Sequence, residues 1–173
     1  HAQLARFFRL PALNIGDTRI IGTELSVNGF GKIGNVTTYL LAGYTYVDPI
    51  YTDTSIDVQS SSETNILKYR NKHSLKFDLE FRYKKFILGT GYIYNSKIEA
   101  IDRALQLPLF GIAQYREEND HGYGNLDFRF GYSFNKKFKL AIISKNLLND
   151  EFMVRPGTLQ APRTFTLRAD YTF

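Results

Sequence analysis

The stretch HSLKFDLEFRY, residues His73 to Tyr83, decides the fold, because apolar and polar side chains alternate along it without a break. A period of two residues is that of a β-strand, whose successive side chains point to opposite faces. One face receives Leu75, Phe77, Leu79, Phe81 and Tyr83, and the other receives Ser74, Lys76, Asp78, Glu80 and Arg82. This length is also close to the roughly 9–11 residues with which a tilted strand crosses a bilayer.

The same alternation recurs along the chain. It is clear in residues 123–134 and 164–173, and it is less regular in residues 19–28, 36–47, 86–94 and 138–148. The sequence therefore predicts an all-β, antiparallel chain of about seven strands.

Short and long connections alternate between these strands. The short ones are residues 30–34, 84–85 and 135–137, and the long polar ones are residues 48–72, 95–122 and 149–162. Outer-membrane β-barrels have short periplasmic turns and long extracellular loops. The pattern therefore favours a transmembrane barrel with its short turns in the periplasm.

Aromatic residues then fall at the two rims of the barrel, where rings anchor such proteins at the membrane interfaces. The periplasmic set is Tyr83, Phe86, Phe134, Phe138, Tyr171 and Phe173, and the extracellular set is Tyr44, Tyr46, Tyr92 and Tyr94. The turn lysines Lys32, Lys84, Lys85, Lys136 and Lys137 are expected at the level of the lipid headgroups.

The alternation also assigns the two faces of the sheet. We expect lipid to contact Phe77, Leu79, Phe128, Phe130 and Leu167, and the lumen or a plug to contact Asp78, Glu80, Asp127, Arg129 and Arg168. A soluble antiparallel barrel with its apolar face inward would show the same alternation and is the structural alternative.

Composition narrows the class further. The 173 residues contain no cysteine, which excludes disulfides and thiolate metal sites and fits an oxidising compartment. The longest apolar runs, such as residues 39–42, are far shorter than the roughly 18 residues of a transmembrane helix. The net charge of +5 is spread along the chain and suits a phosphate-rich membrane surface, so we expect no nucleic-acid partner. Residues 1–6 lack the apolar segment of a secretion signal, which predicts a mature product or a fragment.

Three patterns imitate functional motifs. Residues 29–34, GFGKIG, have the glycine spacing of a dinucleotide site, but a strand pattern follows where that site needs a helix. Residues 117–121, EENDH, could bind a hard cation, but they lack the spacing of a calcium loop. His1, His73 and His121 lie far apart in sequence. We therefore expect no metal, no cofactor and no catalytic site, and interpret the strand charges as a hydrated lumen face.

Several motifs resemble those of TonB-dependent outer-membrane receptors. Near the C-terminus they are residues 145–152 (KNLLNDEF), 155–157 (RPG) and 161–163 (APR), followed by a strand that ends in Phe173; earlier ones are residues 14–24 (NIGDTRIIGTE) and 43–46 (GYTY). Phe173 is similar to the barrel insertion signal of outer-membrane proteins. The tyrosine-rich, cysteine-free composition resembles that of a member of this family from Bacteroidetes.

The resemblance implies that residues 1–173 are the C-terminal part of a 22-stranded barrel in the outer membrane of a Gram-negative bacterium, without the N-terminal plug. Its last strand would pair with a first strand outside this chain. The implied partners are outer-membrane lipid and lipopolysaccharide, the remaining strands and plug of the same receptor, the inner-membrane energy-transducing protein, and a surface lipoprotein or other complex subunits.

The function implied is energised uptake of a scarce ligand, most simply a ferric chelate, and not an enzymatic reaction. Binding residues concentrate on loops held by a rigid scaffold, so loop rings and cations are the candidates. They are Tyr51, Tyr69, Arg70, Arg103, Tyr115 and Arg116. Carbohydrate or peptide uptake is one alternative, and a structural or assembly subunit of an outer-membrane complex is another.

Overall fold

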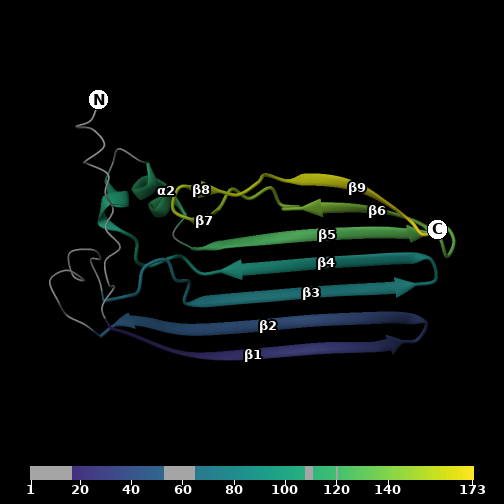
Figure 1. Ribbon diagram of the computed structural model, residues 1–173, viewed down its shortest axis with the longest axis horizontal. Coiled ribbons are helices and arrows are strands. Elements are labelled where there is room, and N and C mark those ends of the chain that lie inside the picture. The colour runs from purple at the N-terminus through teal and green to yellow at the C-terminus, as the bar shows by residue number, and fades with distance from the viewer. Residues whose placement is uncertain (1–16, 53–64, 108–110, 120) are drawn as a thin grey trace.

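A computed structural model describes residues 17–52, 65–107, 111–119 and 121–173. Most of them form one antiparallel sheet of seven strands in the order β1-β2-β3-β4-β5-β6-β9 (Figure 1). The strands are β1 Thr18–Ile33, β2 Val36–Tyr51, β3 His73–Tyr83, β4 Phe86–Asn95, β5 Tyr123–Ser133, β6 Phe138–Lys145 and β9 Thr164–Tyr171. The predicted all-β, antiparallel fold with about seven strands is confirmed.

The first two strands are longer than predicted. β1 and β2 have 16 residues each and pair without interruption from Thr18 opposite Tyr51 to Ile33 opposite Val36. The turn expected at residues 30–34 is therefore reduced to Gly34 and Asn35, with Gly34 in the left-handed region at φ 60°. Glycines within β1 suggested a turn, but continuous pairing with β2 overrides that local preference.

The sixth strand is shorter than predicted. It ends at Lys145 instead of continuing to residue 148, because Asn146 takes a φ of 50° that no strand can accommodate. The side chain of Asn146 is buried, so contacts with the loop beyond the strand fix this change of direction.

Turns and loops separate to opposite ends of the sheet (Figure 1). The three tight turns and the end of β9 gather at one end, and the long connections gather at the other. The alternation of short and long connections that the sequence showed therefore becomes a sheet with a turn end and a loop end.

The register places the predicted apolar set and the predicted charged set on opposite faces. Leu79 and Phe128 both lie opposite Thr90 of the intervening strand, whereas Asp78 and Asp127 both lie opposite Gly91. We call these the apolar face and the charged face. Among the described residues no second layer of helices or strands covers either face (Figure 1).

The loops contain regular structure that the sequence did not predict. They hold a 3₁₀ turn, η2 (Arg103–Gln106), a helix, α2 (Ile112–Glu118), and a small hairpin of β7 (Met153–Arg155) and β8 (Thr158–Leu159). Within the described parts of the chain, no helix is both long and apolar enough to cross a bilayer.

Candidate functional site

Two of the long loops pair with each other at the loop end of the sheet. Asn71 bridges to Ile98, and the backbone N–H of Tyr69 donates to the carbonyl of Ala100 at 2.9 Å. Ile98, Ile101 and Ile112 are buried together, with Tyr69 and Leu105 packed against them. This cluster is a small hydrophobic core beyond the sheet, and it joins the described parts of the β2–β3 and β4–β5 loops.

Charged side chains reinforce the same contact. Lys72 and Glu99 form an ion pair at 3.0 Å, and this partner raises the pKa of Lys72. Asp102 accepts hydrogen bonds from both Lys68 and Tyr69. Burial and the bond to Asp102 raise the pKa of Tyr69 to about 12, so its hydroxyl remains a donor at neutral pH. Burial alone would raise the pKa of Asp102, but the bonds from Lys68 and Tyr69 lower it below its ordinary value. Tyr69, Lys72 and Asp102 therefore keep the charge states that their contacts need.

The third loop is shaped by the KNLLND motif. Asn146 is only 3% exposed; its side-chain amide donates to the carbonyls of Asp150 (2.9 Å) and Ala161 (3.3 Å), and its oxygen accepts from the N–H of Asp150 at 3.0 Å. Asn149 accepts from the N–H of Arg163 at 2.9 Å. Both asparagines have positive φ, a conformation that asparagine tolerates better than most residues. The motif therefore folds the last loop and brings its two ends together.

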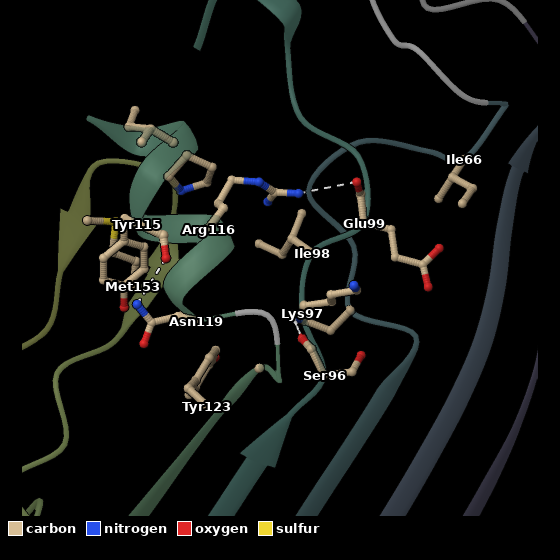
Figure 2. Close-up of a pocket in the computed structure, with 14 residues that line it drawn as sticks. Ile66, Ser96, Lys97, Ile98, Glu99, Tyr115, Arg116, Asn119, Tyr123 and Met153 are labelled. Carbon is tan, nitrogen blue, oxygen red and sulfur yellow. Dashed lines mark hydrogen bonds between the residues drawn. The ribbon is translucent and has the colours of Figure 1, made fainter. Parts of the chain in front are cut away.

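A cavity of about 410 Å³ lies between α2, the segment that follows β4, the start of β5, the β2–β3 loop and the last loop (Figure 2). Its lining residues are Ile66, Asn71, Ser96, Lys97, Ile98, Glu99, Ile112, Tyr115, Arg116, Asn119, Gly122, Tyr123, Met153 and Pro156. Behind it, the ring of Phe152 stacks on Tyr123 at 4.7 Å. Tyr123 belongs to the charged face of β5, so the cavity adjoins that face at the loop end.

The cavity combines cations with rings. Lys97 and Arg116 line it, and Glu99, the one carboxylate among the described lining residues, is paired with Lys72. Arg116 points across the cavity and donates to the carbonyl of Glu99 at 3.3 Å (Figure 2). Tyr115 donates to a backbone carbonyl at 3.4 Å, and its pKa is raised, chiefly by burial. An arginine beside tyrosine rings suits an anionic ligand with flat, delocalised groups.

The structure separates the six loop residues that the sequence singled out. Tyr115 and Arg116 line the cavity, and Tyr69 packs against the hydrophobic cluster beside it. Tyr51 is buried at the end of β2, while Arg70 and Arg103 are exposed and outside the cavity lining. Only two of the six are therefore brought together in a site that could receive a ligand.

Sequence reasoning missed the residues that hold the cavity together. Asn71 donates to the carbonyl of Ser96, and Lys72 pairs with Glu99. Their signal was limited to polar residues at the end of one loop, and nothing in the sequence indicated the partner loop. Of the cation candidate at residues 117–121, Glu117 and Glu118 belong to α2, and Asp120 lies outside the described residues.

The charged face carries an ion pair that crosses a whole strand. Arg129 of β5 donates to both carboxylate oxygens of Asp78 on β3, each at 2.8 Å. Between them β4 has Gly89 and Gly91, neither of which places a side chain in the way. A Cβ on Gly89 would lie 2.8 Å from Nε of Arg129, and one on Gly91 would lie 3.1 Å from the Asp78 carboxylate. The two glycines therefore make room for the pair.

Comparison with solved structures finds the same fold in two outer-membrane receptors. The ferric-catecholate import receptor Fiu from K12 E. coli, in its closed form, is 22% identical with a TM-score of 0.66, over 90% of this chain and 21% of that one. The siderophore receptor PiuA from Acinetobacter baumannii is 17% identical with a TM-score of 0.68, over 90% of this chain and 22% of that one. The chain thus spans about a fifth of the length of either receptor.

Comparison with curated proteins found no match. A family model does match: that of the TonB-dependent receptor-like β-barrel aligns with residues 4–147, which include β1 to β6. It is a family of transport receptors in the Gram-negative outer membrane, not of enzymes, and its members work with a plug and a TonB partner. The alternating strands, the segregated turns and loops and this match agree: the chain is an outer-membrane protein of the TonB-dependent receptor β-barrel family.

Proposed function

We propose that the chain is the C-terminal part of a receptor barrel that takes up a scarce ligand across the outer membrane with energy from the inner membrane. In the described sheet β1 and β9 are the edges, and unpaired backbone groups in lipid cost several kcal/mol each. Further strands of the same receptor are therefore expected to close the barrel. The role is transport and not catalysis.

The ligand that the site supports best is a ferric chelate. The observation that carries this proposal is the cavity at the loop end, where Lys97 and Arg116 stand beside Tyr115 and Tyr123. Catecholate chelates of ferric iron are anionic and aromatic, so cations and rings suit them. The two structural neighbours, one a ferric-catecholate import receptor and one a siderophore receptor, support the same choice.

The partners follow from the proposed role. A plug would contact the charged face, and the inner-membrane energy transducer would act through that plug. The apolar face would contact outer-membrane lipid, and the loop end would meet lipopolysaccharide. A surface lipoprotein or another complex subunit would bind at the loop end, because binding residues concentrate on the loops of a rigid scaffold.

Replacement of a cavity arginine tests the ligand proposal. In a receptor-deletion strain that depends on one ferric catecholate for iron, Arg116→Gln is expected to lower uptake about tenfold, the usual cost of losing one charged contact. Arg103→Gln is the matched control, because Arg103 lies in the same β4–β5 loop but outside the cavity lining. Uptake of radioactive iron by cells with equal receptor levels is the measurement.

Each alternative has its own outcome. Equal uptake by the two variants would contradict a role for the cavity in ligand binding. Normal growth of the deletion strain on every ferric chelate, with loss of growth on an oligosaccharide or peptide, would replace the ferric chelate by that ligand. If a receptor variant lost a protein that co-purifies with the receptor and still took up every ligand normally, a role as a structural subunit would be favoured.

A further inference from the structure

Two lysine pairs lie side by side at the turn end of the sheet. They are Lys84 and Lys85 between β3 and β4, and Lys136 and Lys137 between β5 and β6. The turns are in direct contact, because Ser133 donates its N–H to the carbonyl of Lys85 at 2.8 Å and Lys85 donates its Nζ to a carbonyl of the other turn at 3.2 Å. We call these four residues the lysine rim.

A layer of aromatic rings adjoins the lysine rim. Phe86 and Tyr132 lie 5.0 Å apart, Tyr132 and Phe134 lie 4.9 Å apart, and Phe134 and Phe138 lie 5.4 Å apart. Phe86 and Tyr132 are paired on the apolar face of the sheet. Rings of this kind sit at the membrane interface in barrels, so the lysines beside them reach the level of the lipid phosphates.

No acidic side chain of the described residues pairs with a lysine of the rim. Residues 83–86 and 133–138 contain no acidic side chain. Glu80 and Asp170 lie near this end of the sheet, but they pair with Arg82 and Arg168 at 2.7 Å and 3.2 Å. The rim therefore attracts anions.

One of these lysines occupies a strained backbone conformation. Lys84 has a φ of 53°, in the left-handed region that glycine and asparagine adopt at lower cost. Its ammonium lies 5.2 Å from the centroid of the Tyr83 ring, a cation–π contact that accounts for part of the preference for a lysine there. A charge that also contacts an anion would add to that preference.

We propose that the lysine rim binds an anionic phospholipid of the periplasmic leaflet, with a phosphate at each of the two turns. Short turns of outer-membrane barrels face the periplasm, so the lipid in reach is a phospholipid and not lipopolysaccharide. Lysine binds phosphate as a compact charge, and neighbouring basic residues favour a lipid with two phosphates such as cardiolipin. This proposal is independent of the ligand that the receptor transports.

Lipid binding by the intact receptor in neutral detergent tests the proposal, with cardiolipin and phosphatidylcholine as probes and native mass spectrometry as the measurement. Lys136→Gln/Lys137→Gln is expected to weaken cardiolipin binding about tenfold or more and to leave phosphatidylcholine binding unchanged. Lys76→Gln/Lys145→Gln removes the same charge from the loop-side half of β3 and from the loop end of β6, and should leave the binding of both lipids unchanged.

Lys84→Asn separates lipid binding from turn stability. Asparagine tolerates the left-handed conformation, so this variant should melt at a higher temperature in lipid-free detergent and still bind cardiolipin several-fold more weakly. Unchanged cardiolipin binding in the Lys136/Lys137 variant, equal weakening in the Lys76/Lys145 control, or tighter binding of lipid A than of cardiolipin through these lysines would overturn the proposal.

Discussion

Phe128→Arg is expected to reduce the stability of the intact barrel in a bilayer by about 2–4 kcal/mol, because it places a cation among acyl chains near the middle of a strand. Phe128 lies on the apolar face of β5 and is 36% exposed in the sheet. Folding titrations in lipid vesicles measure the effect.

The neighbouring residue provides the control. Asp127→Asn should change stability by less than about 0.5 kcal/mol, because Asp127 lies on the charged face and its Oδ1 accepts from the N–H of Asn146 at 3.0 Å, which the asparagine oxygen also does. Equal costs, or a larger cost for Asp127→Asn, would mean that the apolar face is the interior of a soluble barrel.

Gly89→Ala is expected to destabilise the barrel by about 1–3 kcal/mol, although it adds a single methyl group. The new Cβ would lie 2.8 Å from Nε of Arg129. The arginine side chain can move away, but only by giving up its two hydrogen bonds to Asp78. The cost is therefore that of the ion pair, whose side chains are about one-third exposed.

Gly43→Ala is the matched control. Gly43 also lies on the charged face within a strand, but a Cβ there would have its nearest contact at 3.8 Å. Alanine at such a position should leave stability unchanged or raise it by about 0.4–1 kcal/mol. If Gly89→Ala acts through the ion pair, it should cost little more once Asp78→Asn is present. An undiminished cost in that double variant would place its cause in the β4 backbone.

The sheet was predictable because the alternation of apolar and polar residues that marks a strand lies within the sequence of that strand. Residues 73–83 were predicted as a strand with the bounds that β3 has, since the alternation is complete and a two-lysine turn ends it. Pairing decided what local sequence could not. β1 extends through Gly29 and Gly31 because β2 continues opposite them, and β6 stops at Asn146 because the last loop holds that side chain.

The candidate site was predictable only in its residue types. Tyr115 and Arg116 were predicted, but α2 has seven residues, too few to show a helical period. The contacts that build the cavity join distant residues: Asn71 and Ser96 lie 25 positions apart, and Arg116 and Glu99 lie 17 apart. A sequence displays such residues without indicating their partners.

Access of lipid to alternate residues of β5 tests the central claim most directly. The 173 residues contain no cysteine, so once any cysteines in the rest of the receptor have been replaced, single cysteines at residues 126–131 can carry a nitroxide each in the membrane-inserted receptor. We predict that dissolved oxygen, which concentrates in lipid, relaxes the labels at Leu126, Phe128 and Phe130, and that a water-soluble nickel chelate relaxes those at Asp127 and Arg129 more strongly. The opposite alternation, or exclusion of both reagents from the apolar positions, would contradict a lipid-facing barrel surface.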